Sequence, residues 1–188
     1  MAYTALLDAC VLYPNSVRDL LMRLAVTDLY RAKWSADIHA EWMRNLAENR
    51  PDIPQARIHR LRDLMDSSVR DAIVDNYAPL IPSLVLPDPH DRHVLAAAIT
   101  GRADLIVTYN LKDFPDSALA PFGIEAQHPD QFLRHQFDLS PDLVCSVVRE
   151  LRVGLRNPPR TVDEYLGILE RHALHEFAAA LRSRAAAL

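Results

Sequence analysis

Acidic side chains stand near the ends of expected strands and on an expected helix of this sequence. They are Asp8, Glu41, Asp91 and Asp113, with the amide of Asn110 close to the last of them. Clustered carboxylates repel one another, so a site that gathers several of them usually needs a cation to neutralise their charge. Oxygen ligands favour Mg²⁺ or Mn²⁺ over zinc. Such an ion activates a water molecule and braces a phosphoryl oxygen, which is the chemistry of phosphodiester cleavage.

The elements that must position these residues follow an alternating α/β pattern. Short apolar runs predict strands at residues 3–7, 81–86, 105–108 and 122–126. Alternating strands and helices indicate a parallel, doubly wound sheet, which presents its ligands at the carboxyl ends of the strands. Three strand ends would then carry Asp8, the turn 88–91 and the segment 110–113. Glu41 would join them from a helix packed above the same edge.

Helices are expected between these strands from apolar residues at helical spacing. Asn15 or Ser16 is expected to cap the first of them, and Ser35 is expected to cap a helix that runs to about Asn49. Further helices are expected over residues 58–69 and 94–100, the latter followed by Gly101 as its C′ residue, and after His128. The pattern thus supplies helical crossovers for a parallel sheet.

From about residue 136 the character of the chain changes, and no further strand is expected. Ser140 is expected to cap one helix, Thr161 begins a second through a capping box with Glu164, and a last helix carries Phe177. A chain of 188 residues with 49% hydrophobic content suits one domain, or one domain with a small appendage. We therefore divide it into a domain at residues 1–135 and a helical extension at 136–188.

Composition narrows the possible functions. The net charge of −4 argues against binding of nucleic acid through bulk positive charge, although a bound cation would still attract a polyanion. No run approaches the roughly 18 uncharged apolar residues of a membrane span, and no basic-then-apolar leader opens the chain. A cytoplasmic protein without membrane attachment is expected.

The cysteines and histidines do not indicate a zinc site. Cys10 and Cys145 are too few for a disulfide framework or a cysteine-based zinc site, and Cys10 is expected to be a buried, inert thiol. The histidines lack paired-ligand spacing. We therefore expect surface or site-adjacent positions for His39, His59, His90 and His93.

Each acidic residue also has an ordinary structural interpretation. Asp8 could be solvated in a loop, and Glu41 could lie on the outer face of its helix. Asp88 is a natural turn former, and Asp91 could be stabilised by the dipole of the following helix. Asp113 could simply end a loop. The metal hypothesis therefore depends on the convergence of three strand ends rather than on any single residue.

Four segments of the chain resemble those of the PIN-domain family. They are 6–14 with 18–21 (LLDACVLYP and RDLL), 35–41 (SADIHAE), 88–98 (DPHDRHVLAAA) and 103–114 (ADLIVTYNLKDF). The resemblance covers about residues 4–134. It implies a PIN-like α/β fold, with a short central parallel sheet flanked by helices, to which a C-terminal helical extension is added. It also implies a Mg²⁺- or Mn²⁺-dependent ribonuclease, of the VapC type found as the toxin of type II toxin–antitoxin pairs.

By position, the resemblance implies that Asp8, Glu41 and Asp91 are metal ligands. The fourth ligand is Asp113 or Asn110, because Asn110 stands where family members often carry an acid. The catalytic set is then Asp8, Glu41, Asp91 and Asp113. Cys10 stands where many members have Ser, Thr or Asn.

The resemblance further implies an RNA substrate, often transfer or ribosomal RNA, together with a cognate antitoxin and a homodimer. The extension could serve dimerisation, antitoxin contact or RNA contact. Two other functions stay open at this point. A degenerate PIN scaffold could bind RNA or a partner, as Asn110 and Cys10 would allow. A phosphatase or phosphotransferase could use Asp8 as its nucleophile, although Cys10 occupies the place where the haloacid-dehalogenase type has a second Asp.

Overall fold

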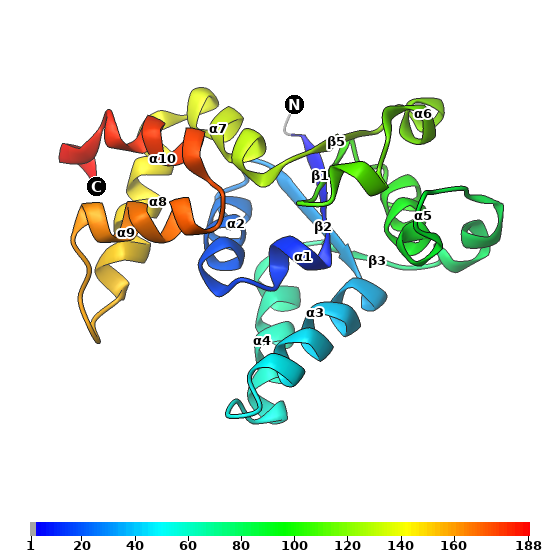
Figure 1. Ribbon diagram of the computed structural model, residues 1–188, viewed down its shortest axis with the longest axis horizontal. Helices are drawn as coiled ribbons and strands as arrows, with labels where there is room; N and C mark the ends of the chain where they lie inside the picture. Colours follow the sequence, from blue (N-terminus) through cyan, green and yellow to red (C-terminus); the bar gives the residue numbers. More distant parts are fainter. Residues whose placement is uncertain (1–2) are drawn as a thin grey trace.

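A five-stranded parallel sheet forms the centre of the protein in a computed structural model that describes residues 3–188 (Figure 1). The strand order is β3-β2-β1-β4-β5, and every neighbouring pair is parallel. The strands are β1 (Thr4–Leu7), β2 (Arg31–Ser35), β3 (Ile73–Val74), β4 (Leu105–Val107) and β5 (Glu125–Gln127). The expected α/β class, a short central parallel sheet flanked by helices with a helical extension, is confirmed.

Helices cover the sheet on both sides. They are α1 (Ala9–Leu12), α2 (Asn15–Val26), α3 (Ala36–Asn49), α4 (Gln55–Ser68), α5 (Arg92–Thr100), α6 (Asp116–Leu119), α7 (Pro129–Leu139), α8 (Pro141–Gly154), α9 (Val162–Arg171) and α10 (His175–Arg182). Figure 1 shows α5 on one side of the sheet and α2 with α7 to α10 on the other, while α3 and α4 project as a pair. No helix within residues 3–188 is long and apolar enough to cross a membrane.

The two central strands, β1 and β4, are apolar because both of their faces are covered. Leu6 and Leu7 of β1 and Ile106 and Val107 of β4 are completely buried. Burial of one such side chain contributes about 1.5–3 kcal/mol relative to exposure. The parallel register pairs Leu7 with Val107, so these strands end side by side. The residues that follow β1 and β4, Asp8 and Thr108, therefore lie next to each other at this edge of the sheet.

The β2 strand was not predicted, although the sequence carries a signal for it. Tyr30, Ala32 and Trp34 are buried, whereas Arg31 is exposed and Lys33 is half-buried. This alternation has the two-residue period of a strand. The short strand β3, which pairs with β2 at the edge of the sheet, was also missed.

The predicted strand at 81–86 is wrong. Residues Ala78–Ser83 form a 3₁₀ helix, η1, and the chain from Leu84 to Asp88 has no regular structure. Pro79 and Pro82 lack the N–H groups that a strand donates to its neighbour, which explains why the apolar run does not pair. The turn 88–91 therefore follows no strand. The third strand end at the site edge belongs to β2, which leads directly into α3.

Two of the expected helix ends differ from the structure. Ser35 caps α3 as predicted, because its hydroxyl accepts a hydrogen bond from the N–H of Ile38 at 3.2 Å. Neither Asn15 nor Ser16 caps α2, since Pro14 occupies the N-cap position and makes no side-chain bond. Gly101, expected as the C′ residue, is the C-cap of α5 at φ −76°, and the positive φ of 52° falls on Arg102 after it. A Cβ at Gly101 would lie 2.8 Å from Val74 Cγ2, which explains why a glycine fits.

The C-terminal helices are joined to one another by polar caps. Asp130 of α7 is 9% exposed, and its two carboxylate oxygens accept the N–H groups of Glu176 and Phe177 at 2.9 and 2.8 Å, at the start of α10. The predicted capping box of Thr161 with Glu164 is confirmed, whereas Ser140 makes no side-chain cap. The proposed boundary at residue 136 falls inside α7, and the division there stays a prediction.

We expect Asp130→Ala to lower the free energy of unfolding by about 1–3 kcal/mol, because two N–H groups of α10 lose their acceptor. Urea denaturation followed by circular dichroism measures the change. Asp138→Ala, on the same helix but half-exposed and paired only with Arg134 on the surface, is the control and should cost less than about 0.5 kcal/mol. Equal stability of the two variants would contradict the role of Asp130.

Candidate active site

Asp8 is the most firmly held of the predicted site residues. It follows β1 directly and caps α1, with its Oδ1 accepting the N–H of Ala9 at 2.7 Å. Its Oδ2 accepts the Thr108 hydroxyl at 2.7 Å and the Cys10 thiol at 3.2 Å. Only 5% of the residue is exposed. Burial raises the pKa of Asp8, Thr108 and Cys10 oppose the rise, and the nearby charge of Glu41 adds to it.

Thr108 and Cys10 form the support of this carboxylate. Thr108 follows β4, is fully buried, and also accepts the N–H of Asn110 at 3.0 Å. Burial, followed by the charge of Asp8, raises the pKa of the Cys10 thiol, which therefore stays protonated and donates. Cys10 thus makes a hydrogen bond at the position where many family members have Ser, Thr or Asn. The residue is partly buried rather than buried as expected, and its thiol bonds to Asp8.

Asp91 lies at the N-terminus of α5. It ends the short 3₁₀ helix η2 (Pro89–Asp91) and occupies the N-cap position of α5. Burial raises its pKa to about 6, and the charges of four other carboxylates add to the rise, in the order Asp8, Asp88, Asp113 and Glu41. The charges of these four carboxylates therefore reach Asp91, and we call the five residues the acid cluster.

Glu41 lies on α3 and pairs with a histidine of α5. Its Oε2 is 3.6 Å from Nε2 of His93. Burial lowers the pKa of His93, but the hydrogen bond and the charge of Glu41 outweigh it, so that the net shift is upward. The buried Nδ1 of His93 has no hydrogen-bond partner among the described residues. His93, which was expected at the surface or beside the site, therefore lies beside the candidate site, against Glu41.

The remaining acids have more local roles. The side chain of Asp88 accepts the N–H of His90 at 2.8 Å, which is the turn-forming role expected of it. Asn110 is the N-cap of the 3₁₀ helix η3 (Leu111–Asp113), and Asp113 is its last residue. Asn110 is exposed and Asp113 is half-buried. The amide of Asn110 makes no side-chain hydrogen bond within residues 3–188. Either residue is free to serve an incoming group.

The donor set of the acid cluster suits a hard divalent cation. Every member is a carboxylate, and within the described chain the only ion-pair partner of any member is His93. No three His, Cys, Asp or Glu side chains among residues 3–188 are grouped closely enough to hold a metal ion by themselves. The composition of the cluster therefore fits such a cation, whereas a closed coordination shell is not formed.

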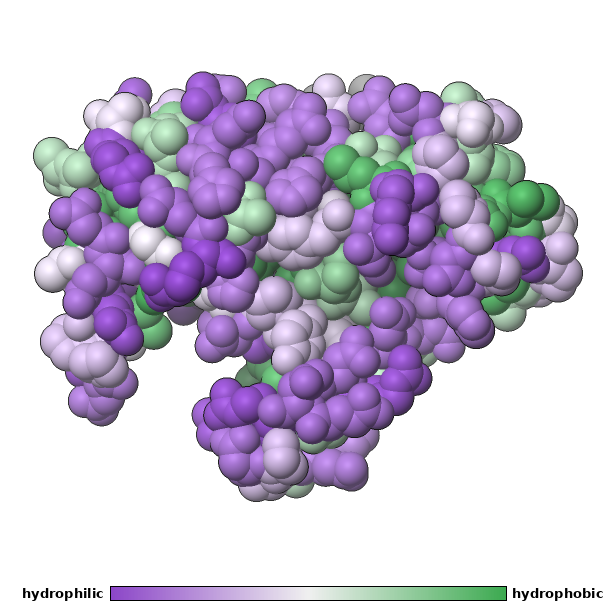
Figure 2. Space-filling model, viewed as in Figure 1, coloured by the Kyte–Doolittle hydropathy of each residue, from purple (hydrophilic) through white to green (hydrophobic). Residues whose placement is uncertain are grey.

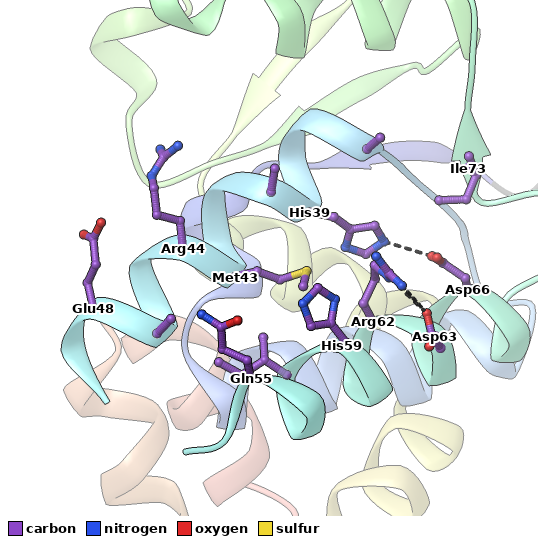
Figure 3. A pocket seen from close by; sticks show the side chains of 14 residues that line it. His39, Met43, Arg44, Glu48, Gln55, His59, Arg62, Asp63, Asp66 and Ile73 are labelled. Atoms are coloured by element: carbon purple, nitrogen blue, oxygen red, sulfur yellow. Dashed lines mark hydrogen bonds and ion pairs between the residues drawn. The ribbon is translucent and has the colours of Figure 1, made fainter. Parts of the chain in front are cut away.

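A cavity of about 720 Å³ lies elsewhere, between α3 and α4 (Figure 3). None of the acid cluster lines it. His39, which points toward Asp66 in Figure 3, was expected at the surface or beside the site but is 3% exposed. Its Nε2 lies 2.8 Å from Asp66 Oδ1, and its Nδ1 accepts Trp42 Nε1 at 2.9 Å. His39 therefore fastens α3 to α4, which is a structural role.

The chain belongs to the PIN-domain family. A family model described as "PIN domain" matches residues 4–112, a stretch that contains the whole of the acid cluster except Asp113. A second model, described as "VapC50 C-terminal domain", matches residues 129–183, which span α7 to α10. The predicted family and the presence of a VapC-type C-terminal unit are thereby confirmed.

Among curated proteins, the chain is similar to "Putative ribonuclease VapC50" of Mycobacterium tuberculosis (strain ATCC 25618 / H37Rv). The two are 46% identical over 92 residues, which are 49% of this chain and 54% of the relative. The chain thus spans about half the length of the curated relative that it matches. No solved structure matches the chain.

The raised pKa of Asp91 predicts a pH-dependent stability. The folded state holds the proton more tightly than the unfolded state, whose pKa is near 3.8, so this contribution to stability is complete below that value and is lost as pH rises through about 6. We expect Asp91→Asn to stabilise the metal-free protein on the order of 1–2 kcal/mol near pH 7.5, after allowance for solvent screening. The gain should vanish near pH 4.

Melting curves in the presence of EDTA at both pH values measure this difference. Asp75→Asn, which removes an exposed acid outside the acid cluster, is the control and should show no such pH dependence. A gain from Asp91→Asn that is equal at both pH values would show that repulsion among the carboxylates is not its cause.

Thr108→Val removes one hydroxyl at nearly constant volume. We expect it to lower the free energy of unfolding by about 1–2 kcal/mol, because the carboxylate of Asp8 loses its shortest side-chain donor and the N–H of Asn110 loses its acceptor. Thr108→Ser keeps the hydroxyl and should retain most of the stability. If the two variants lose stability equally in urea denaturation, the methyl group matters and the hydrogen bonds do not.

Proposed function

We propose that the protein is a metal-dependent endoribonuclease, the toxin of a type II toxin–antitoxin pair, which hydrolyses RNA phosphodiester bonds. The observation that carries the proposal is the buried carboxylate of Asp8, fixed by Thr108 where β1 and β4 end. Glu41 of α3 raises the pKa of Asp8 through its charge, and Asp8 in turn raises the pKa of Asp91 at the end of η2. Membership of the PIN-domain family supports it, as does the similarity to a relative whose name is that of a ribonuclease.

The cation in this proposal is Mg²⁺ or Mn²⁺. Asp8, Glu41 and Asp91 would hold it, and Asp113 or Asn110 would complete its shell. When bound, it supplies positive charge for the phosphate and lowers the pKa of a water molecule. A cation at this place also reconciles a polyanionic substrate with a chain of net charge −4.

The chain's own residues then act mainly by positioning. Thr108 and Cys10 keep one carboxylate oxygen of Asp8 at a fixed place, and the N–H of Ala9 holds the other. His93 holds the carboxylate of Glu41, which leaves Glu41 suited to orient the attacking water. Fixed carboxylates of this kind need no reorganisation when the reaction begins, which is where such sites gain most of their rate.

The proposed partners are the RNA substrate, for which transfer or ribosomal RNA are the candidates, and a cognate antitoxin that covers the site. A homodimer and a cytoplasmic location belong to the same proposal. The family resemblance and the name of the relative support this assignment. Expression with and without a neighbouring antitoxin gene, followed by sequencing of RNA 5′ ends, identifies the cleaved RNA.

A second candidate is a PIN scaffold that binds RNA or a protein without cleaving it. It is favoured by Asn110, which stands where family members often carry an acid, and by the lack of a closed metal-ligand group among residues 3–188. Mn²⁺ binding and cleavage distinguish the two candidates, since the scaffold requires neither.

We expect Asp8→Asn and Asp91→Asn each to reduce RNA cleavage by at least about a hundredfold while circular dichroism shows an intact fold. Each loses a ligand charge, so calorimetric titration should show weakened Mn²⁺ binding. Asp138→Asn, on the far helix α7, is the matched control and should cleave at the wild-type rate. A wild-type protein that neither binds Mn²⁺ nor cleaves RNA would favour the scaffold, and undiminished cleavage by Asp8→Asn would overturn the assignment of the site.

A further inference from the structure

Tyr109 stands between two residues of the candidate site. The residue before it, Thr108, donates to the carboxylate of Asp8, and the N–H of the residue after it, Asn110, donates to Thr108 Oγ1. The N–H of Tyr109 itself donates to Cys10 Sγ at 3.3 Å. The backbone of Tyr109 is therefore part of the support of Asp8, and a shift of this backbone would move that support.

The side chain of Tyr109 is held by the C-terminal helices. Its hydroxyl donates to the carbonyl oxygen of His172 at 2.8 Å, and its ring meets the ring of His128 edge-on, at 5.1 Å between centroids. Burial raises the pKa of Tyr109, so the hydroxyl stays protonated and able to donate. The backbone of Tyr109 therefore lies in the candidate site, whereas its side chain contacts the C-terminal helices, which begin about twenty residues later at Pro129.

The acceptor of this hydrogen bond is itself fixed. His172 lies in the tight turn between α9 and α10, where the N–H groups of His172 and Leu174 both bond to the carbonyl of Leu169. Ala173 adopts a φ of +58° in this turn, a backbone conformation that only firm surroundings impose on alanine. Asp130 holds the other end of the turn, because it caps α10.

We propose that the C-terminal helices brace the candidate active site through Tyr109, which acts as a positioning residue for the Asp8–Thr108 pair. The catalytic part of this inference rests on the proposed function. A rigid acceptor on one unit fixes the ring of Tyr109, the ring fixes the backbone at 108–110, and that backbone fixes Asp8. A displacement of about 1 Å at a reacting group costs up to about a hundredfold in rate, so a single hydrogen bond can matter through this connection.

The test compares Tyr109→Phe with Tyr30→Phe. Both substitutions remove one hydroxyl that donates to a backbone carbonyl, since Tyr30 donates to Leu21 at 2.9 Å. Tyr30 precedes β2, at the end of the sheet away from Asp8, and makes no bond to the support of Asp8. The two variants should therefore lose similar thermal stability, and only Tyr109→Phe should affect the site.

We expect Tyr109→Phe to lower kcat for RNA cleavage about tenfold, with KM within about twofold of wild type, at a temperature where both variants are folded. Tyr30→Phe should keep the wild-type kcat. The effect of Tyr109→Phe should also be non-additive with that of Cys10→Ala, because both act on the same carboxylate. A wild-type kcat for Tyr109→Phe would overturn the proposal and leave this bond a merely structural one.

A second readout does not need activity. The amide N–H of Ala9 bonds to Asp8, about a hundred residues away from Tyr109 in the chain, and its resonance in a ¹H–¹⁵N spectrum reports the position of that carboxylate. Tyr109→Phe should shift this resonance, and Tyr30→Phe should not. If the wild type fails to cleave RNA, the proposed function is wrong. The spectrum still tests separately whether Tyr109 positions the carboxylate of Asp8. An unmoved Ala9 resonance overturns this positioning role.

Discussion

The parallel pairing of β1 with β4 is the constraint on which the rest of the site depends. The N–H of Asp8 donates to the carbonyl of Val107 at 3.1 Å, which continues the strand ladder one residue beyond β1. This register places the Asp8 carboxylate beside the Thr108 hydroxyl. A buried carboxylate is costly unless it is hydrogen-bonded, and here the pairing itself delivers the donors. The apolar cores of two short strands therefore determine where the candidate site lies.

The carboxylates of the acid cluster have no basic partner other than His93 among the described residues, and this determines the electrostatics of the candidate site. The charges of four carboxylates act on Asp91, and within the described residues no lysine or arginine forms an ion pair with any of these five acids. Most other acid–base pairs within residues 3–188 lie at the surface, and the face shown in Figure 2 is largely hydrophilic. An uncompensated cluster costs stability at neutral pH, and a divalent cation would remove this cost. Because the acid cluster destabilises the folded protein, its presence is better explained by binding of a cation than by a contribution to folding.

The sequence predicts best where one short segment contains the whole signal. The continuous apolar runs of β1 and β4 and the caps at Ser35 and Thr161 are of this kind. The run at 81–86 misled because its apolar content was given more weight than Pro82, which cannot donate a hydrogen bond to a neighbouring strand. The position of Asp8 follows from the sequence, whereas its bond to Thr108 joins residues 100 apart and depends on a register that only the fold supplies. His39 was misplaced for the same reason, since its partner Asp66 lies on another helix.

Packing shows why the C-terminal helices and the sheet act together. The ring of Phe132, on α7, meets the ring of Tyr30 edge-on at 4.9 Å, next to the start of β2. The same helix carries Asp130, which caps α10. One helix thus completes the core of the sheet and also anchors the last helices, so a boundary in composition near residue 136 is not a boundary in packing. Because Tyr109 is fastened to this combined body rather than to a mobile appendage, its hydrogen bond to His172 can transmit rigidity to the acidic site.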